Sequence, residues 1–225
     1  MRVLIIEDET RLAQNIAMVL REQASCAVDI SGDGEDGQHM AMTNPYDLII
    51  LDLMLPKIDG LTVLKHLRQQ KCKVPVLAMT ALDDIEDVIL GIDTGCDDYL
   101  TKPFDMRELV VRSKALIRRF HGQTSSVIEI GGLVIDTTAR TVAFQGQCVV
   151  LPAMEYRLLE YLALRKGQIV SKEEILERLY DFDAERFSNV IEVYIRSLRR
   201  RFDPEAPHRL IHTARGLGYV LEPRW

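Results

Sequence analysis

Five short apolar runs, separated by segments with helical periodicity, constrain the first half of this 225-residue chain more than any other feature. Such runs are typical of strands buried on both faces of a parallel sheet. The expected strands are Val3–Ile6, Ala27–Ile30, Leu48–Leu51, Val76–Met79 and Tyr99–Leu100. The expected helices are about Arg11–Gln23, Gly34–Met42, Leu61–Gln69, Ile85–Thr94 and Met106–Arg119. This alternation predicts an α/β fold, a doubly wound five-stranded parallel sheet with helices on both faces.

Carboxylates follow two of these strands at the place where such sheets bind ligands. Five strands fit the flavodoxin-like order 2-1-3-4-5, in which ligands lie beyond the carboxyl ends of the first and third strands. Glu7 and Asp8 follow the first strand, and Asp52 follows the third. Taken alone, Asp52 is best interpreted as a cap of the next helix, but three converging carboxylates are the oxygen donors that Mg²⁺ prefers.

Two further polar residues follow the remaining strands at the same edge. Thr80 comes after the fourth strand, and Lys102 comes shortly after the fifth. Taken singly, Thr80 is a common strand residue and Lys102 an ordinary solvated charge. Together with the three carboxylates they predict a site for a phosphoryl group, whose oxygens Mg²⁺ and Lys102 would neutralise.

Length and charge divide the chain into two expected domains. Residues 1–121 and 127–225 are joined by a polar, aperiodic linker at 122–126. The first 121 residues carry 14 Lys and Arg against 20 Asp and Glu, whereas residues 186–215 carry seven Arg against three acids. Nucleic acid is therefore expected to bind the second half. Because the N-terminus does not resemble a signal peptide and no apolar run approaches the ~20 residues of a membrane span, a cytoplasmic protein is expected.

The second half opens with short strands and continues with helices. A small antiparallel sheet is expected from Val127–Ile130, Leu133–Asp136, Thr141–Phe144 and Val149–Leu151. A helix follows Pro152, with Tyr156, Leu159, Leu162 and Ala163 on its buried face. Ser171 and Glu174 have the spacing of a capping box that opens a second helix.

The third helix, about Asn189–Phe202, has an apolar stripe on one side. The opposite stripe consists of Asn189, Val193, Arg196 and Arg200. Such a helix can lie in a DNA major groove, although a solvated basic face is the simpler alternative. A β-hairpin follows, and Arg215 at its tip suits an AT-rich minor groove.

Several motifs resemble those of a known family. The stretches Ile6–Glu9, Leu51–Pro56 with Asp59-Gly60, Met79–Ala81 and Gly95–Phe104 resemble the CheY-like receiver domain of two-component response regulators. The stretches Leu151–Leu159, Val190–Arg201 and Thr213–Tyr219 resemble the winged helix-turn-helix effector domain of the OmpR/PhoB branch. The two resemblances together cover nearly the whole chain.

The receiver resemblance implies that Asp52 accepts a phosphoryl group from a sensor histidine kinase. Lys102 and Thr80 would contact that group, and Thr80 would draw Tyr99 inward in a two-state switch. The Lys102–Pro103 bond would be cis. Mg²⁺ would be held by Glu7, Asp8, Asp52 and the backbone carbonyl of Met54.

The effector resemblance implies binding of tandem promoter half-sites as a homodimer, with RNA polymerase as a further partner. The implied DNA contacts are Asn189, Tyr194, Arg196, Arg199, Arg200, Thr213 and Arg215. The dimer would form on phosphorylation through Asp97, Asp98, Glu108, Arg112 and Arg119. Asp97 would pair with Arg112, and Asp98 with Arg119, across the interface. Val88 and Leu90 depart from the family pattern there, which predicts a more apolar contact and leaves Glu108 short of its usual partner.

One prediction concerns the lifetime of the phosphoryl group. Met54 and Leu82 occupy the positions that influence a hydrolytic water in this family, and both are apolar. The acyl phosphate should therefore hydrolyse slowly. The chain would be no enzyme beyond its own phosphoryl transfer and slow autodephosphorylation. A phosphohydrolase, or a receiver used only for dimerisation, are the alternatives; Met54 argues against the first, and the complete set of site residues argues against the second.

Overall fold

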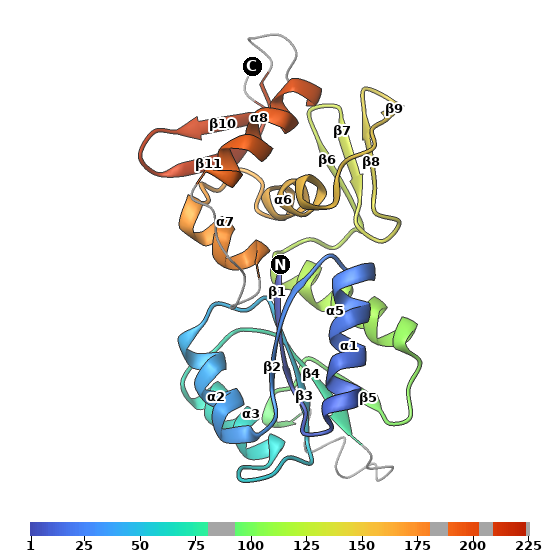
Figure 1. Cartoon of the computed structure of the whole chain (residues 1–225), viewed down its shortest axis with the longest axis vertical. Helices are drawn as coiled ribbons and strands as arrows, with labels where there is room; N and C mark the ends of the chain where they lie inside the picture. Colours follow the sequence, from blue (N-terminus) through green and yellow to red (C-terminus); the bar gives the residue numbers. More distant parts are fainter. Residues whose placement is uncertain (81–92, 181–188, 203–208, 224–225) are drawn as a thin grey trace. The chain divides into compact units, whose positions relative to one another are not determined.

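The computed structural model describes residues 1–80, 93–180, 189–202 and 209–223 (Figure 1). The chain separates into two compact units, Met1–Phe120 and His121–Trp225, and each is considered by itself. Across the described ranges, no helix combines the length and apolar character that crossing a membrane requires. All four cysteines lie within these ranges, and each is a free thiol.

A five-stranded parallel sheet forms the centre of the first unit. Its order is β2-β1-β3-β4-β5, so the predicted fold and strand order are confirmed. Every residue of β1, β3 and β4 is buried, which accounts for their continuous aliphatic sequences. The strands are β1 (Arg2–Ile6), β2 (Ala27–Ser31), β3 (Leu48–Asp52), β4 (Val76–Thr80) and β5 (Asp98–Thr101).

Helices cover both faces of this sheet (Figure 1). Helices α1 and α5 contact each other on one face, and α2 and α3 contact each other on the opposite face. Most of the predicted helix Ile85–Thr94 lies outside the described residues. The described helices of this unit are α1 (Thr10–Gln23), α2 (Gly34–Thr43), α3 (Gly60–Gln69) and α5 (Met106–Phe120).

Local sequence signals set the starts of α2 and α3. Asp33 Oδ1 accepts the N–H groups of Glu35 and Asp36, and Asp59 Oδ1 accepts the N–H of Thr62 at 2.9 Å. These hydrogen bonds favour the ionised carboxyls and hold the pKa of Asp33 and of Asp59 below the usual value. Both helices therefore begin at residues that capping chemistry predicts.

Gly60 brings α3 close behind the end of β3. A Cβ at this position would lie 2.1 Å from the carbonyl oxygen of Asp52, so any side chain here would push the two segments apart. The Gly60 N–H donates to the carbonyl of Leu53 at 3.0 Å. The glycine thus fixes the backbone that carries Asp52.

The second unit opens with an antiparallel sheet of order β6-β7-β8-β9. Three strands have the predicted bounds, but the prediction of Val149–Leu151 as the fourth strand is wrong. Gln145 and Gly146 have φ of 50° and 80°, so the chain reverses within two residues and Gln147 pairs directly with Phe144. The strands are β6 (Val127–Ile130), β7 (Leu133–Asp136), β8 (Thr141–Phe144) and β9 (Gln147–Cys148).

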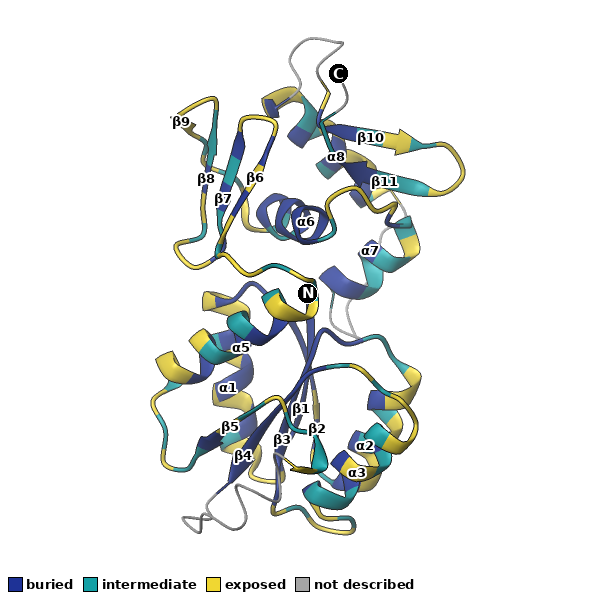
Figure 2. Ribbon diagram, turned by 180° about the vertical axis from the view of Figure 1, so that it is seen from behind, coloured by how far each residue is buried: buried dark blue, intermediate teal, exposed yellow. Residues whose placement is uncertain are grey.

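Three helices and a β-hairpin complete this unit. Helix α6 lies at its centre and is almost entirely buried, as Figure 2 shows. The ring of Phe202 on α8 meets that of Phe144 edge to face at 5.6 Å, which fastens α8 to the sheet. The elements are α6 (Ala153–Leu164), α7 (Lys172–Leu179), α8 (Val190–Phe202), β10 (Ile211–Ala214) and β11 (Gly218–Leu221).

The predicted capping box at α7 is formed by one of its two side chains. Ser171 Oγ accepts the N–H of Glu174 at 3.0 Å, as predicted. The Glu174 carboxylate turns toward α6, where it accepts from the Tyr161 hydroxyl at 2.8 Å and from Arg165. Glu174 therefore joins two helices, a role that the local sequence pattern does not reveal.

Candidate functional site

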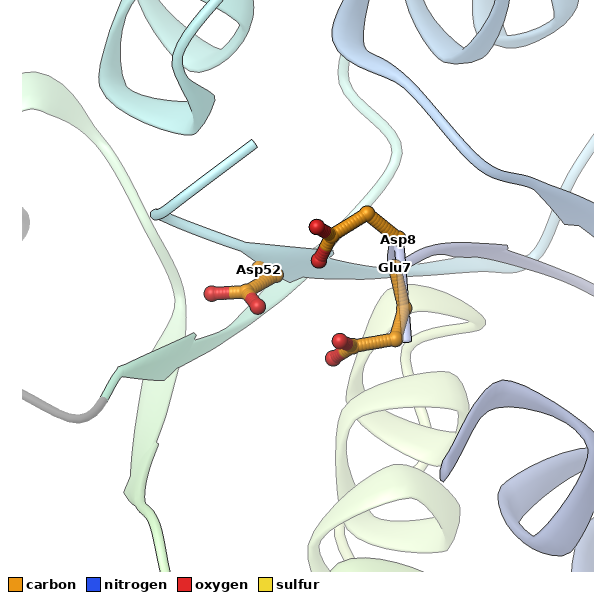
Figure 3. Close-up of side chains that lie close together, drawn as sticks. All are labelled: Glu7, Asp8 and Asp52. Carbon is orange, nitrogen blue, oxygen red and sulfur yellow. The ribbon is translucent and has the colours of Figure 1, made fainter. Parts of the chain in front are cut away.

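Three carboxylates meet at the carboxyl ends of β1 and β3. Figure 3 shows the side chains of Glu7 and Asp8 projecting toward that of Asp52. One oxygen from each carboxylate lies within 4.8 Å of the other two. Glu7 and Asp52 are only 1% and 4% exposed, whereas Asp8 is exposed to solvent. The convergence predicted from the strand order is present.

Lys102 reaches this cluster from the segment after β5. Its Nζ donates to Asp52 Oδ2 at 2.7 Å and to Glu7 Oε2 at 2.8 Å. The Lys102 N–H donates to the carbonyl of Thr80 at 2.7 Å, and the following peptide bond to Pro103 is cis, as the resemblance implied. The lysine is thus held at both its backbone and its ammonium group.

The charges of the site are not balanced by Lys102 alone. Burial raises the pKa of Glu7 more than the hydrogen bond from Lys102 lowers it, and the neighbouring charge of Asp52 raises it further. Burial alone would lower the pKa of Lys102, but its bonds to Asp52 and Glu7 outweigh that effect and raise it. Three carboxylates and one ammonium leave two negative charges, which a divalent cation would neutralise.

Backbone and side-chain donors orient the Asp52 carboxylate. The Met54 N–H donates to Oδ1 at 3.0 Å, while Lys102 takes Oδ2. The side chain of Met54 is 59% exposed beside the site. Leu82, the second residue predicted to influence hydrolysis, lies outside the described residues. Thr80 is buried at the end of β4, and Tyr99 on β5 is exposed.

The residues predicted for a dimer interface have partners within the chain. Arg112 binds Asp98 Oδ2 at 2.9 Å and Glu108 Oε1 at 2.7 Å. Asp97 Oδ2 accepts from Arg68 and from the N–H of Val76, both at 2.8 Å. Arg119 is exposed near the end of α5. Val88 and Leu90 lie outside the described residues.

Arg68 is a residue that sequence reasoning missed. Besides Asp97, its guanidinium donates to the carbonyls of Gly95, Cys72 and Val74 at 2.9 to 3.0 Å. It therefore joins the end of α3 to the segment before β5. A lone Arg in the last turn of a helix is an ordinary helix-end residue, so no sequence signal could have found this role.

The basic stripe of α8 is exposed in the second unit. Asn189, Arg196 and Arg200 are exposed, and Val193 beside them is 61% exposed. Ile191, Ile195, Leu198 and Phe202 are buried on the other side, as the predicted apolar stripe requires. Glu192, an acid on the exposed side, is paired by Lys172 at 2.7 Å. The outward surface of α8 is therefore basic.

Three of the predicted DNA contacts, Arg199, Thr213 and Tyr194, have partners within the protein. Arg199 donates from Nη2 to Thr213 Oγ1 at 2.7 Å and from Nε to the carbonyl of Ile211 at 3.1 Å. The hydroxyls of Tyr194 and Tyr180 lie 3.5 Å apart. Arg215 is exposed at the tip of the β10–β11 hairpin, two residues after Thr213.

Comparison with known families matches both halves of the chain. Residues 3–114 match the family described as Response regulator receiver domain. Residues 146–221 match the family described as Transcriptional regulatory protein, C terminal. The first match contains the carboxylate cluster and Lys102, and the second contains α8 and the hairpin.

Curated relatives match over nearly their full length. The chain is 43% identical over 224 residues to the Transcriptional activator protein IrlR of Burkholderia pseudomallei, with 100% of this chain and 97% of IrlR covered. It is 40% identical over 220 residues to the Response regulator ArlR of Staphylococcus aureus, with 98% and 99% covered. The receiver domain of the Francisella response regulator 1452 is 39% identical at a TM-score of 0.51, covering 52% of this chain and 97% of that structure.

The Lys102 ammonium should be needed to stabilise the carboxylate cluster. Replacing it in Lys102→Met leaves buried like charges unpaired and should lower the free energy of unfolding by about 2–3 kcal/mol. Added Mg²⁺ should restore part of that loss, because a cation in the cluster replaces the missing charge. Urea unfolding with and without Mg²⁺ measures both effects.

Lys57→Met is the matched control for this substitution. Lys57 also binds a carboxylate, Asp33, at 2.7 Å, but its side chain is 56% exposed. An exposed pair contributes little, so this variant should unfold almost as the wild type does. Equal stability of Lys102→Met and wild type would contradict the predicted role of the ammonium.

Proposed function

Because this chain belongs to the OmpR/PhoB family of two-component response regulators, we propose that Asp52 is the phosphoacceptor that controls its regulation of transcription. The observation that carries this assignment is the convergence of Glu7, Asp8, Asp52 and Lys102 at one sheet edge. The site serves the chain's own phosphoryl transfer, including a slow autodephosphorylation.

The proposed transfer begins at the oriented carboxylate of Asp52. One carboxylate oxygen attacks the phosphorus of a phosphohistidine on a sensor kinase. The phosphorus–nitrogen bond breaks, the imidazole nitrogen keeps its electron pair, and Asp52 becomes an acyl phosphate. The bonds from Met54 N–H and Lys102 hold the carboxylate before the reaction, which reduces the entropic cost of alignment. Lys102 is placed to follow the phosphoryl oxygens, and Thr80 lies at the adjacent strand end.

The donor set suits Mg²⁺ as the cofactor. Glu7, Asp8, Asp52 and the carbonyl of Met54 would supply hard oxygen ligands, and the two excess negative charges call for a dication. When bound, Mg²⁺ neutralises charge on the transferring phosphoryl group. The three carboxylates are thereby relieved of mutual repulsion.

Phosphorylation is proposed to act through Thr80 and Tyr99 on a homodimer. The proposed interface contains Asp97, Asp98, Glu108, Arg112 and Arg119. Within one chain Arg112 is already bound by Asp98 and Glu108, and Asp97 by Arg68. Pairing across a dimer therefore requires an exchange of these ion pairs, which keeps the net gain of dimerisation small and easily shifted.

The second unit is proposed to bind tandem promoter half-sites, with RNA polymerase as a later partner. Asn189 and Arg196 would read bases in the major groove, and Arg200 would contact phosphates. Arg215 would enter the minor groove, while Tyr194, Arg199 and Thr213 complete the predicted surface. The proposed boundaries are 1–121 for the receiver, 122–126 for the linker and 127–225 for the effector.

The phosphoacceptor assignment predicts a stoichiometric, Asp52-dependent modification. Incubation of the full chain with acetyl phosphate and Mg²⁺ should add one phosphoryl group to the wild type and none to Asp52→Asn. Intact-mass measurement tests this, and Asp36→Asn, which changes an exposed acid on α2, should behave as wild type. Continuous phosphate release without accumulation of the adduct would favour a phosphohydrolase instead.

The exposed, apolar Met54 predicts a long-lived acyl phosphate. A methionine cannot hold a hydrolytic water, so Met54→Asn, whose amide can orient one, should shorten the lifetime several-fold. Leu82→Asn should act in the same direction. Loss of phosphate from the isolated phosphoprotein measures this. A lifetime of seconds to a minute that neither substitution changes would contradict it.

Substitutions on α8 should distinguish residues that read bases from residues that bind phosphates. Arg196→Ala should reduce discrimination between specific and random DNA by about 1–3 kcal/mol. Arg200→Ala should weaken binding to both and reduce the salt slope by about one. Fluorescence titration at several salt concentrations, on a duplex obtained by binding-site selection, measures both. Equal loss of specific and random affinity in Arg196→Ala would exclude base reading by that residue.

A further inference from the structure

The guanidinium of Arg199 joins α8 to the first strand of the β10–β11 hairpin. Nε donates to the carbonyl of Ile211 at 3.1 Å, and Nη2 donates to Thr213 Oγ1 at 2.7 Å. The two acceptors are two residues apart on β10, a spacing that the planar fork of an arginine spans. The Arg199 side chain therefore forms intramolecular hydrogen bonds that connect α8 to β10.

The second strand of the hairpin is attached at a different place. Val170 and Tyr219 exchange two backbone hydrogen bonds, at 2.8 and 2.9 Å. Gly218 has a φ of 140°, and a Cβ there would lie 2.0 Å from the carbonyl oxygen of Val170. The chain thus approaches Val170 as closely as a glycine allows. This contact fixes β11, and Arg199 fixes β10.

Arg215 lies just beyond the Arg199 contact. The turn is closed by the Leu217 N–H, which donates to the carbonyl of Ala214 at 2.9 Å, and Arg215 is exposed within it. Only one residue separates Arg215 from Thr213. If β10 lost its hydrogen bonds to Arg199, the hairpin could pivot about its attachment at Val170. Arg215 would then move relative to α8.

We propose that Arg199 is a positioning residue. It sets the placement of Arg215 relative to Asn189 and Arg196, the proposed base-reading residues of α8, and does not itself contact a DNA phosphate. This rests on the proposed DNA-binding function and revises the role that the family resemblance implied for Arg199. Two of its N–H groups are hydrogen-bonded to β10, at 3.1 and 2.7 Å, and these bonds hold the guanidinium against the hairpin. Arg200, the next residue, is exposed and remains available for phosphates.

The physical benefit is preorganisation of a two-part binding surface. A hairpin already held in place loses less conformational freedom when it enters a minor groove. Without Arg199, the favourable binding free energy from Arg215 would be partly offset by the conformational entropy lost when the hairpin becomes ordered. The contribution of Arg215 to affinity should therefore depend on Arg199.

A double-mutant cycle on the full chain tests this dependence. The probe is the highest-affinity duplex recovered by binding-site selection with the wild type. Arg199→Ala and Arg215→Ala should each weaken binding about tenfold, whereas adding Arg199→Ala to Arg215→Ala should cost less than about twofold. Arg200→Ala combined with Arg215→Ala is the matched control and should be additive.

Salt dependence and a lysine variant separate positioning from phosphate binding. In the Arg215→Ala background, Arg199→Ala should leave the salt slope unchanged, whereas loss of a phosphate ligand would lower it by about one. Arg199→Lys keeps the charge but loses the fork, so it should restore little affinity. Substantial rescue by lysine would overturn the proposal.

The protein without DNA provides an independent readout. Amide hydrogen exchange at Ala214, Gly216 and Leu217 should be faster in Arg199→Ala and in Thr213→Val, with thermal unfolding of the second unit little changed. Unchanged exchange would overturn the proposal. If Arg215→Ala leaves affinity intact, the proposed DNA surface fails and this inference with it. If Arg215→Ala weakens binding but the cycle with Arg199 is additive, only the inference fails.

Discussion

The first unit depends on the salt bridges that Lys102 makes inside a cluster of carboxylates. Burying Glu7 and Asp52 beside each other is costly, and one ammonium at 2.7 to 2.8 Å from both offsets only part of that cost. The remaining negative charge makes the cluster a place where a metal ion could be held. In the proposed function, this charge imbalance is the property that the phosphoryl chemistry would use.

In the second unit, the main feature is a set of contacts that hold the exposed basic helix α8 and the β10–β11 hairpin in place. At its last residue, Phe202 of α8 packs against Phe144 of β8, and near its start Glu192 forms an ion pair with Lys172 of α7. Arg199 extends this rigidity to the hairpin. The arginines of one helix thus have two different surroundings: Arg199 is bound to the hairpin, whereas Arg196 and Arg200 are exposed to solvent.

Much of this could be predicted because periodicity and strand ends are local properties of the sequence. The strand order and the meeting of Glu7, Asp8, Asp52 and Lys102 follow from apolar runs and the residues after them. The predicted strand Val149–Leu151 failed because the φ values of Gln145 and Gly146 set the hairpin register, and apolar content does not encode a turn. The predicted capping role of the Glu174 side chain was wrong for a similar reason, because Tyr161 and the C-cap residue Arg165 of another helix bind its carboxylate instead.

The sequence by itself determined the family, the sheet order, the carboxylate cluster and the basic stripe of α8. Each of these depends on which residues occupy a strand end or a helix face. Only the tertiary structure decided the partners of the long cationic side chains. It placed Arg68 on Asp97, Arg112 between Asp98 and Glu108, and Arg199 on Thr213. A flexible side chain can reach several acceptors, and the fold selects among them by bringing distant segments within hydrogen-bonding distance.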